Sequence, residues 1–302
     1  HLEKAIHMAK NGRPGPVWVD IPLDVQAALL DETQLAGFDP GSEMNEVSTG
    51  ILTSQIGRSI ELLNRSERPV ILAGNGIRLA NALDDFHEWI EMLQVPVLTT
   101  WKAIDFLGET HPLFAGRPGA AGQRGANFVQ QNSDWLLTVG ARLDLGQTAY
   151  THHCFARAAH KTVVDIDIHE INKLRMFIDV PIKADAKAFI REFMRNGSKV
   201  AQRNRNGWTA KCKEWQASYP VVLPEYRDEK DWVNDYVLID VLSDEMSGED
   251  LLVPGSSGAC SERTMQAFRV KEGMRILNSQ GLGSMGFGIP AAIGACIASG
   301  GK

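Results

Sequence analysis

Short apolar runs alternate with amphipathic stretches through the middle of this chain. The runs fall at residues 69–73, 96–100, 135–140, 162–168 and 180–183. Continuous apolar character over a few residues is typical of strands buried on both faces of a parallel sheet. Apolar residues at helical spacing predict helices over 80–93 and 185–196 and a further helix that ends near Asn132. This rhythm predicts an α/β fold with a doubly wound, mostly parallel sheet.

The regions on either side of this pattern predict two smaller units. Residues 1–28 indicate an amphipathic helix, a Gly-Pro turn and a buried strand at VWVDI, residues 17–21. Aperiodic stretches at 29–50 and 198–230 predict linkers, the second with a helix over 208–218. The last unit, 231–302, should contain the following helices, strands and turn: helix 233–246, strand 250–254, a Gly/Ser turn, helix 261–269, strand 275–277 and a helix from about Pro290. The central unit is then 51–197.

Composition and charge narrow the function classes. The chain has 302 residues, of which 44% are hydrophobic and 23% charged, as in an ordinary soluble globular protein. A net charge of −6 gives no electrostatic support for binding nucleic acid or an anionic membrane. The four cysteines are far apart and form no CxxC pair, so we expect reduced thiols and a cytoplasmic location. We expect no metal at His152-His153-Cys154, because adjacent side chains rarely face the same way.

Glycine-rich segments follow several predicted strands. Gly281, Gly283, Gly286 and Gly288 precede the last helix, where a helix N-terminus suits an anion. The turn Gly255-Ser256-Ser257-Gly258 could cradle a diphosphate with its N–H groups. An ordinary strand-to-helix turn is the alternative for the first segment, and a Gly/Ser turn with a helix cap at Ser261 is the alternative for the second.

Polar residues at the ends of the central strands indicate a second candidate site. In an open parallel sheet, ligands bind beyond the carboxyl ends of the strands. Gly74 starts a Gly-Asn-Gly turn after one strand, and Arg142, Asp167 and Asp185 follow others. Arginine can pair with a phosphate or carboxylate, and the acids can accept hydrogen bonds from ribose hydroxyls. Because GxGxxG is missing, a Rossmann-like scaffold without a nucleotide remains an alternative.

Three collinear segments carry a resemblance to a known family. They read GRPGPVWVDIPLDVQ from Gly12, SDWLLTVGARLD from Ser133 followed by VVDIDIHEINK, and GLGSMGFGIPAAIGA from Gly281. Together they resemble thiamine diphosphate enzymes of the acetohydroxyacid (acetolactate) synthase group. The resemblance implies that 1–28 close a pyrimidine-binding domain, that 51–197 form a Rossmann-like middle domain, and that 231–302 open a diphosphate-binding domain. The chain would then be an internal fragment.

The resemblance also implies a reaction. The family decarboxylates a 2-keto acid such as pyruvate and transfers the activated aldehyde to an acceptor, with the cofactor as electron sink. A simple 2-keto acid decarboxylase is the nearest alternative, and a non-catalytic nucleotide-binding module is another. An NAD dehydrogenase is less well supported, because no GxGxxG follows any strand.

Residue roles follow from the same resemblance. Met285 would hold thiamine diphosphate in a bent shape and the Gly283 carbonyl would accept a hydrogen bond from its amino group, which makes both catalytic. The implied thiamine diphosphate contacts are Gly255, Ser256, Ser257, Gly283, Ser284 and Met285. In the middle domain the family holds FAD, ADP or nothing, and the implied contacts are Arg13, Gly74, Thr99, Thr100, Arg142, Asp167 and Asp185.

Some family elements are altered or lie outside this chain. The second arginine of the family's DDRVTG is lost at 144–148, and Leu23 replaces a lysine, changes that bear on the flavin and the acceptor. The catalytic glutamate would precede His1, and the Mg²⁺ ligands would follow Lys302, so we expect the chain to be inactive alone. The expected partners are a small 2-keto acid and further copies in a homodimer or homotetramer, without nucleic acid or membrane.

Overall fold

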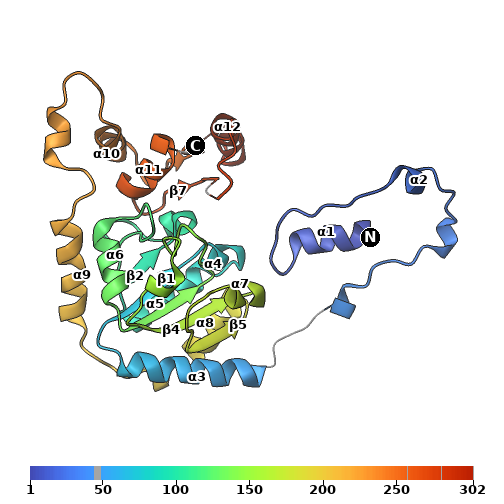
Figure 1. Cartoon of the computed structure of the whole chain (residues 1–302), viewed down its shortest axis with the longest axis horizontal. Coiled ribbons are helices and arrows are strands. Elements are labelled where there is room, and N and C mark those ends of the chain that lie inside the picture. Colours follow the sequence, from blue (N-terminus) through green and yellow to red (C-terminus); the bar gives the residue numbers. More distant parts are fainter. Residues whose placement is uncertain (44–48, 257, 280, 302) are drawn as a thin grey trace.

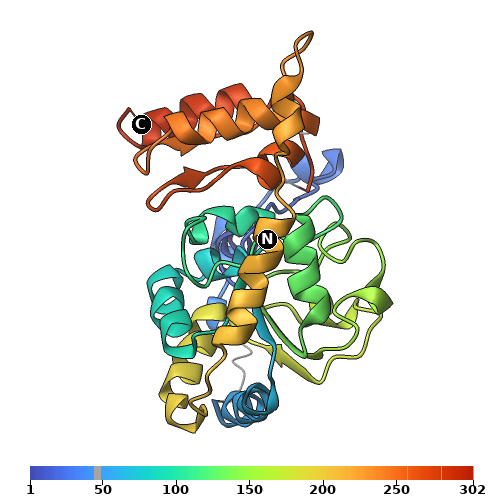
Figure 2. The ribbon, with the colours of Figure 1, turned by 90° about the vertical axis from the view of Figure 1, so that its left-hand side faces the viewer.

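The computed structural model describes residues 1–43, 49–256, 258–279 and 281–301. Three parts are visible in Figure 1. We call residues 1–43 the N-terminal arm, residues 49–218 the central domain, and the described residues from 219 on the C-terminal unit. The arm extends to one side of the other two parts, and the C-terminal unit lies over one end of the central domain (Figures 1 and 2).

The central domain is built on a five-stranded sheet in the order β2-β1-β3-β4-β5. All neighbouring strands are parallel. The strands are β1 (Pro69–Ala73), β2 (Val97–Thr99), β3 (Trp135–Val139), β4 (His160–Asp165) and β5 (Val180–Lys183). The predicted α/β class with a doubly wound parallel sheet is therefore confirmed. The predicted strand at 162–168 is too long, because the chain turns into helix α7 after Asp165.

Helices cover both faces of this sheet. Successive strand residues point to opposite faces, so Ile71 and Ala73 join one buried cluster while Val70 and Leu72 join another. The first cluster includes α3 (Thr49–Arg65), α4 (Gly76–Leu79), α5 (Leu83–Leu93) and α8 (Ala186–Arg195). The second includes α6 (Arg124–Asn132), α7 (Ile168–Asn172) and α9 (Asn206–Ser218). Figure 2 shows α9 running along the central domain toward the C-terminal unit.

The C-terminal unit has a small core that the central domain helps to fill. Its elements are η6 (Pro224–Asp228), α10 (Asp235–Glu245), β6 (Leu251–Leu252), η7 (Gly258–Cys260), α11 (Glu262–Ala267), β7 (Arg275–Ile276) and α12 (Gly288–Ala298). β6 and β7 pair in parallel. Met265, Phe268 and Ile276 form the core together with Ile104, which comes from η3 (Trp101–Phe106) of the central domain. Each element predicted here appears, most of them shorter than expected.

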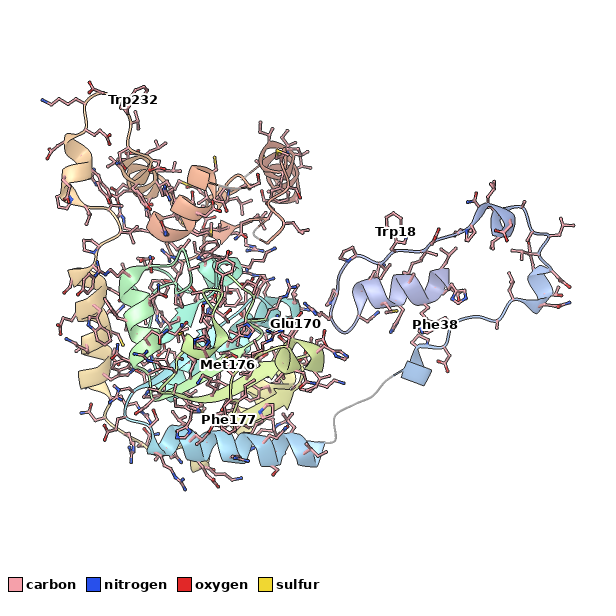
Figure 3. The ribbon with its side chains drawn as sticks, in the orientation of Figure 1. Trp18, Phe38, Glu170, Met176, Phe177 and Trp232 are labelled. Carbon is pink, nitrogen blue, oxygen red and sulfur yellow. The ribbon has the colours of Figure 1, made fainter. Side chains whose placement is uncertain are left out.

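The N-terminal arm corrects one prediction. The predicted helix forms as α1 (Leu2–Lys10), followed by α2 (Leu23–Gln26), η1 (Glu32–Gln34) and η2 (Pro40–Glu43). The buried strand predicted at 17–21 is wrong: these residues are not in a strand, and Trp18 is 92% exposed and points away from the rest of the chain (Figure 3). A parallel strand needs a neighbour to pair with, and the described residues place none beside this segment.

Two further short 3₁₀ turns complete the central region, η4 (His152–Cys154) and η5 (Gly197–Lys199).

Among the helices that the structure describes, we find none with the length and apolar character that a membrane crossing requires.

Candidate functional site

A cleft of ≈ 1920 Å³ lies where the three parts of the chain meet. The arm contributes Arg13 and its neighbours, and the central domain contributes the carboxyl edge of its sheet. The C-terminal unit contributes the loop that precedes α12. The cleft therefore joins both candidate sites of the sequence analysis, the strand ends and the glycine-rich loop.

An ion cluster at the sheet edge ties the arm to the central domain. Glu170 on α7 contacts Arg13 Nη2 at 2.7 Å, Arg142 Nε at 3.3 Å, and Lys173. Arg13 also pairs through Nη1 with Asp167 Oδ2 at 2.8 Å. Glu170 lies on the edge of the central domain that faces the arm (Figure 3). Three cations face Glu170 and Asp167 here, with Asp165 close to Arg13, and the guanidinium groups of Arg13 and Arg142 can pair with an anionic ligand.

The pKa values of the carboxylates at this sheet edge are shifted in different directions by their surroundings. Burial acts to raise the pKa of Glu170, but hydrogen bonds and charge from Lys173 and Arg13 outweigh it and lower the pKa. The backbone N–H of His169 and the Arg13 guanidinium lower the pKa of Asp167. Burial instead raises the pKa of Asp165, which also lines the cleft. Asp165 is thus the carboxylate of this edge whose charge the fold disfavours.

Four of the residues predicted to hold FAD or ADP line this cleft, namely Arg13, Thr100, Arg142 and Asp185. Asp185 caps α8 and accepts from Lys187 N at 2.9 Å and Ala188 N at 3.0 Å. Arg142 is in a left-handed conformation with φ +58°. This backbone shape is uncommon for a residue with a side chain and is often found at binding sites.

The other three, Gly74, Thr99 and Asp167, do not line the cleft. Asp167 caps α7 by accepting from His169 N at 2.9 Å. Thr99 is fully buried, and its backbone N–H donates to Gly116 O at 3.1 Å. Gly74 packs against another turn, since a Cβ there would lie 2.2 Å from Gly140 O and from Ala141 Cα. Close packing of two crossover turns therefore explains Gly74 without a ligand.

The two predicted coenzyme segments of the C-terminal unit come together. A Cβ on Gly283 would lie 3.0 Å from Ser256 O, and one on Gly288 would lie 3.4 Å from Gly255 Cα. Gly283 itself has φ +58°, in the left-handed region. The turn at 255–256 and the loop at 281–288 are thus adjacent backbones, although 25 or more residues separate them along the chain. Ser257 lies outside the described residues.

The loop presents apolar side chains outward. Met285 is 96% exposed and Leu282 is 93% exposed, while Ser284 lines the cleft. Two further polar atoms of the cleft, Glu262 Oε2 and Ser279 Oγ, are buried without a hydrogen-bond partner among the described residues. Buried polar atoms normally have partners, so these two are ready to bind a polar group. The exposed apolar side chains and these two polar atoms together fit a ligand with polar and apolar parts.

Sequence reasoning missed Glu170. The signal was present, because Asp167 and Glu170 have the spacing of a helix N-cap followed by an acid at its third position. The apolar residues before them instead suggested a strand that ran through to 168. The sequence could not pair Glu170 with Arg13 and Arg142, because these two arginines lie on other elements.

Comparison with known families matches two regions of the chain. Residues 56–193 match the family "Thiamine pyrophosphate enzyme, central domain". Residues 256–302 match "Thiamine pyrophosphate enzyme, C-terminal TPP binding domain". The chain belongs to the thiamine pyrophosphate enzymes. The second match begins at Ser256 and contains the whole 281–288 loop, so the loop and Ser256 of the turn belong to the region that the family describes as TPP binding.

Individual relatives agree with this family. The acetolactate synthase isozyme 1 large subunit of Escherichia coli (strain K12) is 31% identical over 299 residues, covering 99% of this chain and 50% of that protein. The acetolactate synthase large subunit of Corynebacterium glutamicum is 33% identical, covering 97% and 46%. A probable acetolactate synthase large subunit of Methanococcus aeolicus is 31% identical, covering 98% and 51%. The chain thus spans about half the length of these relatives.

Within the described ranges, His, Cys, Asp and Glu side chains do not gather in threes that could hold a metal ion. His152 instead accepts a hydrogen bond at Nδ1 from Arg175 N at 2.9 Å.

Proposed function

We propose that the full-length protein is a thiamine diphosphate-dependent enzyme that decarboxylates a 2-keto acid such as pyruvate. It would pass the activated aldehyde to an acceptor, as in acetolactate synthases. The observation that carries the proposal is the contact between the 255–256 turn and the 281–288 loop beside the cleft. The relatives' names, all acetolactate synthases, support the reaction class.

The residues of this chain would bind and orient the coenzyme. When bound, thiamine diphosphate supplies the electron sink for loss of CO₂. Gly255 and Ser256 would face its diphosphate, and the Gly283 carbonyl would accept a hydrogen bond from its amino group. The exposed Met285 side chain would support its rings, because a thioether packs well against aromatic edges. Mg²⁺ would accompany the diphosphate on ligands outside residues 1–302.

The edge of the central sheet would hold a second group. We propose FAD or ADP there, supported by the cations Arg13, Arg142 and Lys173 at this edge and by Thr100 and Asp185 on the cleft surface. The visible absorbance of the purified full-length protein distinguishes the two: a flavin spectrum supports FAD, and adenine released without flavin supports ADP. Absence of both flavin and adenine would contradict this part of the proposal.

Homodimer or homotetramer formation completes the proposal. The apolar side chains of Leu282, Met285 and Ile289 stand exposed on the loop and on α12. Exposed apolar groups of this kind mark surfaces that contact a ligand or another chain. The mass of the full-length protein in solution checks the assembly, and a monomer under assay conditions would contradict it.

The decisive experiment measures CO₂ release by the full-length protein across a panel of 2-keto acids, with thiamine diphosphate and Mg²⁺. We expect release from at least one acid, and release only with the coenzyme present. Met285→Ala should lower kcat/KM by about tenfold or more while Tm stays unchanged, because the side chain is exposed in this chain. Phe177→Ala is the matched control, an exposed side chain outside the cleft that should leave both unchanged. A protein that binds no thiamine diphosphate would overturn the proposal.

A further inference from the structure

The short helix η3 (Trp101–Phe106) is where the central domain contacts the strand that leads to the coenzyme loop. Ile104 is fully buried in the core of the C-terminal unit, beside Ile276 of β7. The carbonyl of Trp101 accepts a hydrogen bond from Asn278 Nδ2 at 3.2 Å. Both contacts are therefore made by residues 276–278, which shortly precede the 281–288 loop.

Asp105 on this helix forms ion pairs with both the central domain and the C-terminal unit. Its side chain is completely buried and contacts Arg78 Nη2 of the central domain at 2.9 Å. It also contacts Arg275 Nη1 of β7 at 2.6 Å and accepts from the backbone N–H of Ile276 at 3.0 Å. Residues 105 and 275 are 170 positions apart in the sequence. One carboxylate thus bridges an arginine from each part.

The arrangement depends on the carboxylate's charge. Two guanidinium groups share one carboxylate, so the group of three carries one excess positive charge around a carboxylate that is itself completely buried. Burial and the charge of Arg275 lower the pKa of Arg78, although Asp105 acts in the opposite direction. Arg78 Nη1 is buried and has no hydrogen-bond partner within the described residues. Without Asp105 the two arginines would repel each other, and β7 would lose its anchor.

We propose that Asp105 is a positioning residue, which fixes the end of β7 and thereby the placement of the 281–288 loop against the 255–256 turn. The proposal deepens the proposed function and rests on it for the coenzyme, because the loop is the segment assigned to thiamine diphosphate. Asn278 and Ser279, which line the cleft, follow β7 directly. A displacement of β7 would therefore be transmitted to the loop over only a few residues.

The test compares Asp105→Asn with Asp134→Asn in the full-length protein. Asp134 accepts from Glu67 N and Arg68 N, both at 2.9 Å, within the central domain alone. Both variants lose a carboxylate that holds backbone N–H groups, so both should lower Tm. We expect only Asp105→Asn to raise the Kd of thiamine diphosphate, by about fivefold or more. Equal weakening by both variants, or unchanged binding by Asp105→Asn, would overturn the proposal.

A second measurement does not need the coenzyme. Hydrogen exchange of peptides covering 281–288 in the coenzyme-free protein should be faster in Asp105→Asn and unchanged in Asp134→Asn. If the wild-type protein does not bind thiamine diphosphate, the proposed function fails, and this exchange result still decides whether Asp105 positions the loop. Should Asp105→Asn fail to fold, Arg275→Gln removes the guanidinium contact of β7 with Asp105 and leaves the Ile276 N–H bond and the Arg78 pair in place. It should shift exchange in the same direction, and unchanged exchange in that variant would overturn the proposal.

Discussion

Two glycine-rich turns in this chain look alike in sequence but differ in what surrounds them. At the edge of the central sheet, Gly74 packs against the backbone of Gly140 and Ala141. In the C-terminal unit, Cβ atoms added to Gly281 or Gly286 would meet no atom within 4 Å. Packing within the chain requires glycine at the first turn. In the second turn the positive φ of Gly281 (+113°) and Gly286 (+78°) favours glycine, while the space beside both residues stays open to a ligand or another chain.

The comparison teaches that glycine density alone does not locate a binding site. Both turns follow apolar strands, and both were assigned ligands from the sequence. The neighbours of an added Cβ distinguish a glycine that packs against its own chain from one that faces outward. Substitutions at the two turns should therefore affect different properties, the first mainly stability and the second mainly coenzyme binding.

The largest effect is expected at the packed turn. Gly74→Ala would place a Cβ 2.2 Å from Gly140 O, so it should cost about 3 kcal/mol or more of the free energy of unfolding. Urea denaturation measures this change. Gly57→Ala is the control: it lies in α3 with no atom within 4 Å of the added Cβ and should stabilise by about 0.5–1 kcal/mol. A Gly74→Ala variant as stable as the wild type would remove the contrast between the turns.

A smaller loss of stability and a larger loss of binding are expected at the 281–288 loop. Gly283→Ala meets Ser256 O at 3.0 Å and a left-handed backbone, worth about 1–2 kcal/mol. Because the added methyl group would also push the loop away from the 255–256 turn, we expect the Kd for thiamine diphosphate to rise about tenfold by calorimetry. Gly300→Ala has φ +76° and no atom within 4 Å, so it should reproduce the backbone cost without the change in Kd. Equal Kd values for both variants would contradict the assignment of the loop.

The ion cluster should add a pH-dependent contribution at the sheet edge. The pKa of Glu170 is lowered in the folded chain, so its stabilisation is present above its ordinary value of 4.5 and is lost as the pH falls through the lowered folded value. Glu170→Gln should therefore cost about 1 kcal/mol at pH 7, since Arg13 and Arg142 are partly exposed. Urea unfolding at several pH values checks this. The variant and wild-type stabilities should converge in acid, and a constant gap would refute the mechanism.

The smallest effect has the opposite sign. Burial raises the pKa of Asp165, so its charge destabilises the fold once the pH exceeds the raised value. Asp165→Asn keeps an oxygen for the Asp167 N–H and should raise Tm at pH 7 by about 1–2 °C, a gain that disappears below 3.8. Asp167→Asn is the comparison, because the pKa of Asp167 is lowered and its loss should reduce Tm. A lower Tm for Asp165→Asn would show that its charge is needed at the edge.

Sequence patterns predicted the layers of the fold because burial imposes them locally. The apolar runs at 69–73 and 135–139 are strands, as expected, since both of their faces are covered. The run at 17–21 has the same character and is no strand, because a strand depends on a neighbour that local pattern cannot supply. Helix α3 could have been found, since Leu52, Ile56, Ile60 and Leu63 repeat at helical spacing.

The candidate site was predicted by segment and only partly by contact. Recognisable motifs placed the 255–256 turn and the 281–288 loop, and the structure shows that they touch. The ion pairs of Arg13 with Glu170 and of Asp105 with Arg275 join residues more than 150 positions apart. Charged residues are common on every surface, so no periodicity marks which of them will meet. Such pairs follow from the topology and can be identified only once it is known.

Ile104 has a consequence for anyone who recombines this protein with its relatives. Its side chain belongs to the central domain by sequence but fills the core of the C-terminal unit. A chimaera whose crossover falls in the polar linker after α9 would keep each sheet intact. The core of its C-terminal unit would, however, be completed by an η3 residue from the other parent. Productive exchanges should therefore carry η3 together with the unit it completes.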